Sequence, residues 1–407
     1  MIVGHRAWGT REMGGYRTRR TSNEITREEY NYGCRRETTS TWTEPGSGPR
    51  PERGRRIASA DHRGAGSLEV SSVPNKPMTD LEAMVGDSKV TVEEFRIEPG
   101  KVEEFARSIT ETDPVFRDPD AAADRGFDRV PAPLTYPRVS RFPRYRPEDV
   151  EMYGFDLGFQ PEYVLHGEQT YEYERPLQVG DVLTGTTTLA KVFQREGGRA
   201  GTMTFAVYET EYRDENDDLV LTDRATAIET SGAVQNDADD GEESDDSSDA
   251  DETAAVANGG QVPEPDSLET VSSVADVSVG DTGPTVVVED LERKHFVKYA
   301  GASGDFNPIH YDEPYARAAG NESVFGQGMF TAGVASRVVT NWFGLESIDS
   351  FGVRFQSQVF PGDSIVATGE IVDGESDDGV VEVDLEATNQ HGETLLTGSA
   401  TATLEED

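Results

Sequence analysis

The sequence predicts two folded domains of one α+β type, each an antiparallel sheet wrapped on a helix. Three observations indicate this: a repeat between the two parts of the chain, a helix with one buried face, and long runs of alternating polar and apolar residues. At 407 residues the chain is also too long for one ordinary domain.

The repeat relates residues 78–232 to residues 266–407. An offset of 194 residues aligns Asp113 with Asn307 and Pro114 with Pro308. Further on, "RPLQVGDVLTG" corresponds to "VFPGDSIVATG". Because the matches keep the same order, we interpret the two segments as an ancient duplication that gave two domains with one fold.

The elements of each domain follow from the spacing of apolar residues. In "GMFTAGVASRVVTNWFG", Phe330, Val334, Val338 and Trp342 recur every four residues, which predicts one buried helix face. Alternating runs then predict strands. They are "YVLHGEQTYEYERP", "GTMTFAVYETEYRDE" and "LVLTDRATAIE" in the first half, and "SFGVRFQSQVF", "GVVEVDLEATNQ" and "TLLTGSATATL" in the second. One apolar helix with several long strands is typical of an α+β unit.

Two segments lie outside these domains. Residues 1–77 hold 14 Lys and Arg against 9 Asp and Glu, without sustained periodicity, so we expect a basic, disordered extension. Met78 is an alternative start of the chain. Between Asp237 and Glu252, ten of sixteen residues are acidic. Such a segment buries too little to offset its ordering entropy, so we expect a disordered acidic linker over residues 233–265.

Composition restricts the function. The net charge is −41, and residues 78–407 hold 23 Lys and Arg against 69 Asp and Glu, which excludes nucleic acid as a partner. This composition favours a halophilic cytoplasmic enzyme over a merely acidic protein. The single cysteine, Cys34, excludes internal disulfides and cysteine-based metal sites. No apolar run approaches the roughly 20 residues of a membrane span, and the N-terminus lacks a signal-peptide core. We expect a soluble protein without metal or cofactor.

The stretch "GDFNPIH" carries the candidate chemistry. Asp305 stands five residues before His310, with Asn307 and Pro308 between them. Pro308 stiffens the turn, and Asn307 can hydrogen-bond the local backbone. A carboxylate and an imidazole on one turn can converge on one water molecule and divide two proton transfers. The alternative is a helix-capping aspartate and an ordinary loop histidine.

The run "YAGASGDFNPIHYDEPYARAAG", followed by "VFGQGMFTAG", resembles the hydratase motif of the MaoC-like family, the (R)-specific enoyl-CoA hydratases and 3-hydroxyacyl-CoA dehydratases. The first half resembles the partner domain known as FAS1-like dehydratase. The resemblance implies a tandem hotdog fold, each unit an antiparallel sheet around a central helix. Two fused hotdogs form a pseudo-dimer within the chain, so a monomer and a homodimer of the chain both stay open.

The resemblance also implies a reaction and its residues. The reaction is the reversible hydration of trans-2-enoyl-CoA to (3R)-3-hydroxyacyl-CoA, a hydro-lyase activity of fatty-acid metabolism with an acyl-CoA thioester as substrate. Asp305 and His310 would be the catalytic pair, and the Gly328 N–H the oxyanion donor. Ser336 matches a position that lines the site, with helix packing as its alternative role, and Asn307 completes the motif. Relatives often carry histidine where this chain has Gln327.

The first half lacks the Asp and His pair of this motif. Phe116 stands where His310 stands, and Glu111 where Asp305 stands, so we expect Glu111 to matter little for turnover. Prolines cross the region aligned with the central helix and exclude a long helix there; they are Pro131, Pro133, Pro137 and Pro143. In double-hotdog hydratases a shortened helix opens a wide acyl tunnel, so the resemblance implies acyl chains longer than crotonyl.

Two other functions stay open. One is a hydratase for a branched or dicarboxylic acyl-CoA such as mesaconyl-CoA, for which Arg337 or Arg354 would bind the second carboxylate. The other is a hotdog protein that is not a lyase, either a thioesterase or an acyl-CoA-binding subunit. We expect structural roles for three further histidines, which are His166, His295 and His391.

Overall fold

The computed structural model describes residues 76–148, 150, 153–160, 163–197, 201–230, 270–374 and 379–405. These residues belong to one structural unit, Leu68–Asp407. The prediction for residues 1–77, of which the structure describes only Lys76 and Pro77, stays a prediction. The prediction for the linker at 233–265 falls outside the described residues and stays one too. Within the described ranges, no helix combines the length and the apolar character needed to cross a bilayer.

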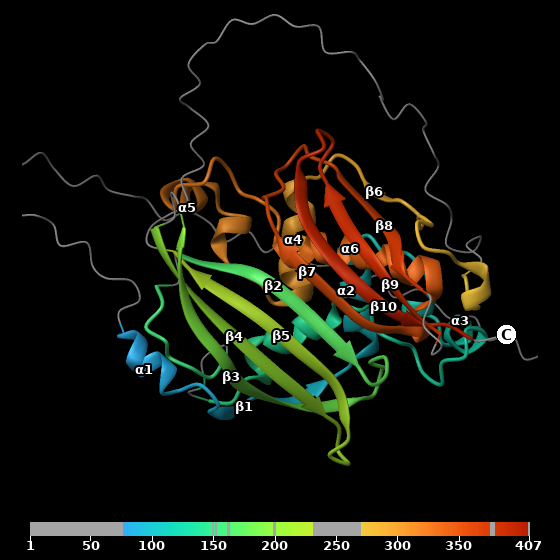
Figure 1. Cartoon of the computed structure of the whole chain (residues 1–407), viewed down its shortest axis with the longest axis horizontal. Helices are drawn as coiled ribbons and strands as arrows, with labels where there is room; N and C mark the ends of the chain where they lie inside the picture. Colours follow the sequence, from blue (N-terminus) through green and yellow to red (C-terminus); the bar gives the residue numbers. More distant parts are fainter. Residues whose placement is uncertain are drawn as a thin grey trace, which may run out of the picture. The chain divides into compact units, whose positions relative to one another are not determined.

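The described strands form one ten-stranded antiparallel sheet in the order β1-β3-β4-β5-β2-β7-β10-β9-β8-β6 (Figure 1). The first half contributes β1 (Ser88–Arg96), β2 (Val164–Tyr173), β3 (Val182–Gly197), β4 (Gly201–Arg213) and β5 (Leu219–Glu229). The second contributes β6 (Val286–Val288), β7 (Ile348–Phe355), β8 (Ile365–Asp373), β9 (Val380–Thr388) and β10 (Thr394–Thr403). The halves join where β2 pairs with β7, for example Tyr171 with Phe351.

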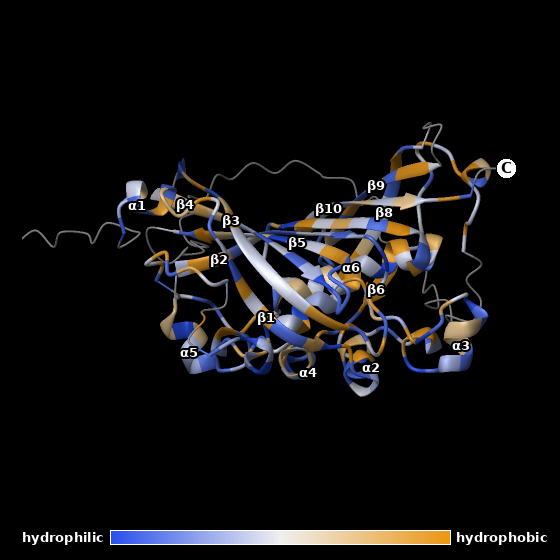
Figure 2. Ribbon diagram, turned by 90° about the horizontal axis from the view of Figure 1, so that it is seen from below, coloured by the Kyte–Doolittle hydropathy of each residue, from blue (hydrophilic) through white to orange (hydrophobic). Residues whose placement is uncertain are grey.

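The helices α2, α4 and α6 lie on one face of this sheet (Figure 2). The α-helices are α1 (Met78–Glu82), α2 (Pro99–Ser108), α3 (Pro119–Asp124), α4 (Arg293–Ser303), α5 (Glu313–Ala318) and α6 (Gly328–Phe343). The short 3-10 helices are η1 (Pro114–Phe116), η2 (Tyr136–Arg141), η3 (Pro143–Tyr145), η6 (Val274–Asp276), η7 (Pro308–His310) and η8 (Leu345–Ser347).

Helix α6 is the core of the second half. It packs against the strands β6 to β10. The predicted apolar face is confirmed, since Phe330, Val334, Val338 and Trp342 are all buried. Full burial of each such side chain stabilises the fold by about 1.5–3 kcal/mol. The six alternating runs predicted as strands are also confirmed, as β2, β4, β5, β7, β9 and β10.

The repeat seen in the sequence extends to the elements. At the same offset of 194 residues, α2 corresponds to α4, η1 to η7, and α3 to α5. Helices α2 and α4 contact each other, and the Lys101 Nζ of α2 donates to the Gly301 carbonyl of α4 at 2.9 Å. The two halves therefore bring their equivalent helices together on the same face of the sheet.

The halves differ where the central helix is expected. The second half has the 16-residue α6, whereas the described residues at the corresponding place in the first half form the 3-10 helices η2 and η3. Pro137 and Pro143 stand in the first turns of these short helices, where a missing N–H costs nothing. In a longer helix each would remove a backbone hydrogen bond. The prediction that no long helix forms in this region is confirmed.

Candidate active site

Two local features shape the loop that carries Asp305 and His310. Gly304 ends α4 with a φ of 82°, in the left-handed region that residues with a Cβ rarely adopt. Asn307 begins η7, and its Oδ1 accepts a hydrogen bond from Ile309 N–H at 3.3 Å. The sequence predicts such a local hydrogen bond for Asn307, and the structure contains it.

The imidazole of His310 is buried and held from one side. The residue is 6% exposed, and its Nδ1 lies 2.9 Å from the carbonyl oxygen of Phe325. Because a carbonyl only accepts, we assign the proton to Nδ1, which leaves a lone pair on Nε2. Nε2 has no hydrogen-bond partner in the described part of the chain, yet it is not among the unpartnered atoms sealed from solvent. Nε2 is therefore the nitrogen that can accept a proton.

The carboxylate of Asp305 forms an ion pair with an arginine from the other half. The Arg138 Nη2 of η2 lies 3.1 Å from Asp305 Oδ2, and the two side chains are 12% and 19% exposed. Asp305 Oδ1 accepts a longer hydrogen bond from Asn307 N–H at 3.4 Å. One oxygen thus faces the first half, and the other stabilises the loop.

Asp305 and His310 stand five residues apart on one loop, and each affects the pKa of the other. Burial alone would raise the pKa of Asp305, but the nearby charges of Arg138 and His310 and the hydrogen bonds hold that pKa below its ordinary value. Burial lowers the pKa of His310, and the carboxylate of Asp305 opposes only part of that shift. At neutral pH the pair is a carboxylate beside a neutral imidazole, and both can accept a proton.

Gly328 is the first residue of α6. The first N–H groups of a helix have no partner inside it and carry partial positive charge. Among the described residues, none accepts a hydrogen bond from the Gly328 N–H, and no side chain caps α6. A Cβ at this position would lie 3.0 Å from the ring of Phe355. The preceding Gln327 is buried, and its Nε2 donates to the carbonyl of Phe296 at 3.1 Å.

Ser336 is buried in α6, and its hydroxyl donates to the carbonyl of Gly333 at 2.9 Å. This hydrogen bond is internal to the helix and fits the packing role. A Cβ on Gly333 would lie 2.5 Å from Cγ2 of Ile109, so this turn of α6 touches the first half. The role of Ser336 in lining the site stays a prediction.

The equivalent position in the first half is filled. Glu111 is 4% exposed and accepts hydrogen bonds from the backbone N–H groups of Thr112 and Asp113, at 2.6 and 2.8 Å. Its other oxygen accepts from Arg337 Nε at 3.2 Å. The cavity lined by Glu111 and Phe116 holds only about 10 Å³, room for about one water molecule. This half lacks the imidazole of the second half.

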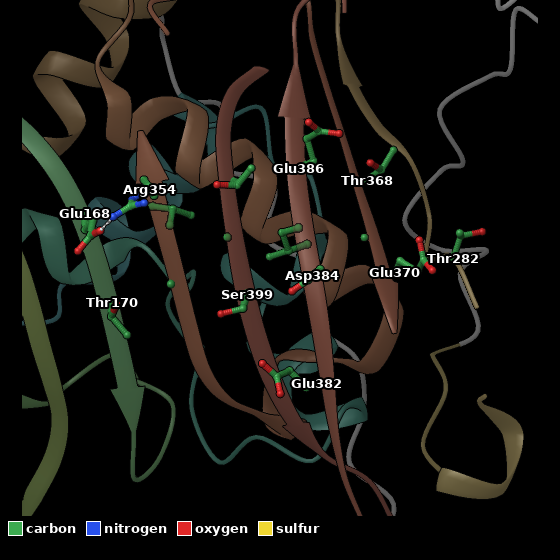
Figure 3. A pocket seen from close by; sticks show the side chains of 16 residues that line it. Glu168, Thr170, Thr282, Arg354, Thr368, Glu370, Glu382, Asp384, Glu386 and Ser399 are labelled. Atoms are coloured by element: carbon green, nitrogen blue, oxygen red, sulfur yellow. Dashed lines mark hydrogen bonds and ion pairs between the residues drawn. The ribbon is translucent and has the colours of Figure 1, made fainter. Parts of the chain in front are cut away.

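The two arginines considered for a second carboxylate are both engaged. Arg337 is committed to Glu111. Arg354 is 65% exposed and pairs with Glu168, as Figure 3 shows. The arginine at the Asp305 carboxylate is Arg138, which sequence analysis missed. The available signal was an arginine inside the apolar run "VPAPLTYPRVSRF" of a chain poor in basic residues.

His166, for which the sequence predicts a structural role, is half-buried near Phe355. Burial, together with the positive charge of Arg138, lowers the pKa of His166 to about 4, and the residue interacts with the charge of Asp305. Its Nε2 is buried without a hydrogen-bond partner. The ring lies 5.0 Å from that of Phe355, the side chain beside Gly328. A strand of the first half therefore contributes to the surroundings of the site.

A separate groove of about 700 Å³ lies on the strands of the second half and β2 (Figure 3). The figure shows α6 behind these strands, so the groove opens on the other face of the sheet. Its acidic residues are Glu168, Glu370, Glu382, Asp384 and Glu386. Of the candidate residues named from the sequence, Arg354 lines it, but it is paired there with Glu168, and we assign the groove no chemistry.

Two family models match the chain. The FAS1-like dehydratase domain region matches residues 83–223, and the MaoC-like domain matches residues 270–393. A UPF0336 protein of Clavibacter michiganensis is 42% identical over 92 residues, which are 23% of this chain and 60% of that protein. A UPF0336 protein of Thermobifida fusca is 32% identical over 111 residues, 27% of this chain and 71% of that protein. The match thus spans less than two thirds of the first relative.

Solved structures share the fold. A MaoC-like dehydratase superimposes with a TM-score of 0.63 at 24% identity, covering 80% of this chain and all of the other. A Mycobacterium tuberculosis protein described as having a double hotdog fold gives a TM-score of 0.50 at 15% identity, covering 78% and 96%. The predicted tandem hotdog is confirmed. The chain belongs to the MaoC-like dehydratase family, with a FAS1-like dehydratase region in its first half and a MaoC-like domain in its second.

Proposed function

We propose that this protein catalyses the reversible hydration of trans-2-enoyl-CoA to (3R)-3-hydroxyacyl-CoA. The observation that carries the proposal is the loop of the second half, where a buried imidazole held through Nδ1 follows, five residues on, a largely buried carboxylate. Membership of a dehydratase family supports the same reaction class. The family alone leaves the substrate open.

The chemistry requires two proton movements and one addition. The oxygen of water adds to C3 of the enoyl thioester while one proton leaves that water, and C2 then gains a proton. Asp305 and His310 both begin unprotonated, so the pair can take up the proton of the water and pass a proton to C2. Burial holds the pKa of His310 below its ordinary 6.5, so this state persists into mildly acidic solution.

Addition at C3 moves negative charge onto the thioester oxygen. We assign the stabilisation of that charge to the Gly328 N–H at the start of α6, because this donor has no partner among the described residues. One such donor is worth about 2.7–4 kcal/mol in the transition state. The missing side chain at Gly328 would let the thioester approach the backbone.

We infer that the acyl group of the substrate is uncharged. A dicarboxylic substrate needs a cation for its second carboxylate, and Arg337 and Arg354 are each paired with a glutamate. The short helices η2 and η3 in place of a second central helix support acyl chains longer than crotonyl, as in related double-hotdog hydratases. No observation favours a thioesterase, and that activity is an outcome of the assay below.

The test is the loss of enoyl-thioester absorbance with crotonyl-, octenoyl- and mesaconyl-CoA in parallel. We expect turnover with octenoyl-CoA to exceed that with mesaconyl-CoA. The assay is run at molar KCl because the acidic composition favours a protein that works at high salt. Free thiol is measured in the same samples, since its release without hydration would identify a thioesterase instead.

Two variants test the residue assignment. Asp305→Asn and His310→Ala should each lower kcat by at least about 100-fold while the circular dichroism spectrum is unchanged. Asp276→Asn and His391→Ala replace the same residue types at exposed positions of the second half and should leave kcat unchanged. Wild-type rates in Asp305→Asn and His310→Ala would reject the site.

A further inference from the structure

We propose that Arg138, which the first half supplies, is a positioning residue for Asp305 and that the active site is completed by both halves of the chain. The inference rests on the proposed function and adds a residue to it. Three features of the molecule support it: the ion pair across the two halves, the packing of the segment that carries Arg138, and the charges around Asp305.

The ion pair between Arg138 and Asp305 is short and largely buried. Arg138 Nη2 lies 3.1 Å from Asp305 Oδ2, in a setting where both side chains are largely screened from water. In such surroundings an ion pair is weakened much less by salt than a surface pair. The Nε of Arg138 is buried without a partner. Desolvation of this donor costs free energy that packing for stability alone would avoid.

The segment around Arg138 is packed onto the catalytic loop at a second point. A Cβ on Gly304 would lie 2.5 Å from Cδ2 of Phe142, and the ring of Phe142 stands edge-on to that of Phe306, with centroids 5.8 Å apart. Phe142 thus packs against the residues immediately before and after Asp305, and Arg138 pairs with Asp305 itself. The first half holds the loop by an aromatic contact and a charge.

Four titratable side chains affect Asp305, from four different elements. They are Arg138 of η2, His166 of β2, Tyr299 of α4 and His310 of η7. His166 is neutral above pH 4, and burial raises the pKa of Tyr299 far above neutrality. His310 is neutral in the active state. Of these four, Arg138 carries the full positive charge, so it keeps the carboxylate ionised and turned toward η2.

The first measurement is the pH profile of kcat/KM for Arg138→Met and Arg138→Lys. Without the guanidinium the pKa values of the pair rise, so the acid limb should move up by about one pH unit. We expect kcat to fall at least tenfold in Arg138→Met with KM within about twofold, because a positioning residue acts on the reacting groups. Arg138→Lys should recover part of kcat, since it restores the charge but not the planar fork.

Arg144 offers a matched control. It lies in η3, six residues further along, and pairs with Glu98 at 2.6 Å on the surface. Arg144→Met removes a guanidinium from the same segment and should leave the pH profile and kcat unchanged. Equal effects of Arg144→Met and Arg138→Met would show that the segment acts only through its packing, and would overturn the inference.

A second readout does not depend on activity. The chain has six histidines, so proton NMR can follow the His310 imidazole, identified by its loss in His310→Ala. The charge of Arg138 lowers the pKa of His310. That pKa should therefore rise by about half a unit or more in Arg138→Met, and less when Asp305→Asn is also present. If Arg138→Met does not fold, Arg138→Gln, which also removes the charge, is titrated in its place.

The two readouts separate the inference from the proposed function. A wild-type protein inactive on every enoyl thioester would reject the function, while the His310 titration would still decide the role of Arg138. An active wild type with unchanged kcat, pH profile and His310 titration in the Arg138 variants would reject the inference alone.

Discussion

At the scale of single residues, the proposed site depends on the missing side chain of Gly328 as well as on the side chains of Asp305 and His310. Gly328→Ala adds a Cβ 3.0 Å from the ring of Phe355, which is tighter than ordinary van der Waals contact. The ring or the start of α6 must shift by a few tenths of an ångström. Because an oxyanion donor works only at hydrogen-bond distance, we expect kcat to fall about tenfold or more.

Gly100→Ala is the control for this substitution. Gly100 lies in the first turn of α2, and a Cβ there meets nothing within 4 Å. Stability and kcat should match the wild type or improve slightly, since alanine is the better helix former. Full activity of Gly328→Ala with every substrate would show that its N–H does not bind the thioester oxygen.

At the scale of elements, the sequence predicts those whose pattern is regular. The runs that form β2, β4 and β5 alternate regularly between polar and apolar residues, whereas β1 was not predicted from the sequence. Its pairing with β3 shifts register twice, and Glu94 within it has a φ of 48°. These irregularities break the period of two on which strand prediction depends.

The loop from Gly304 to His310 was predictable for the opposite reason. Its glycine, asparagine and proline each have a local structural role, namely the helix cap, the hydrogen bond to Ile309 and the first position of η7. None of these roles depends on distant parts of the chain. The contact between Asp305 and Arg138 spans 167 residues, and no local pattern indicates it.

No local sequence pattern indicates the ion pair between Glu111 and Arg337 either. Because of this ion pair, we expect removal of Glu111 to lower stability. Glu111→Ala leaves Arg337 charged and unpaired inside the fold, so the free energy of unfolding should fall by about 3–5 kcal/mol. We still expect kcat per folded molecule to stay within about threefold of wild type, because this half lacks the imidazole. Denaturant unfolding and an active-enzyme assay at low temperature measure the two effects separately.

The double variant Glu111→Gln with Arg337→Met completes this experiment. Removing both charges should restore part of the lost stability, because the unpaired cation is gone. A loss of kcat in Glu111→Ala as large as in Asp305→Asn, with the fold intact, would show that the first half takes part in the chemistry.

At the scale of the whole molecule, the two halves share one fold and differ in the residues at the equivalent loop positions. The sheet is continuous through β2 and β7, so the halves are fixed in one register. Each half sends an arginine to the acidic residue of the other: Arg138 to Asp305, and Arg337 to Glu111. The second contact is buried between the halves, while the first involves a carboxylate on the same loop as His310. One symmetric arrangement thus serves structure on one side and the site on the other.

The charge of the molecule leads to a last prediction. Residues 78–407 hold 46 more acidic than basic side chains, so the folded state repels itself at low ionic strength. The screening length falls from about 10 Å at 0.1 M salt to about 3 Å at 1 M. We expect Tm to rise by several degrees between 0.1 and 2 M KCl, with turnover rising over the same range. Sucrose at equal osmolality is the control, because it stabilises without screening charge. A Tm that is flat in KCl, or that rises equally in sucrose, would show that charge repulsion does not limit stability and that the acidic composition is no adaptation to salt.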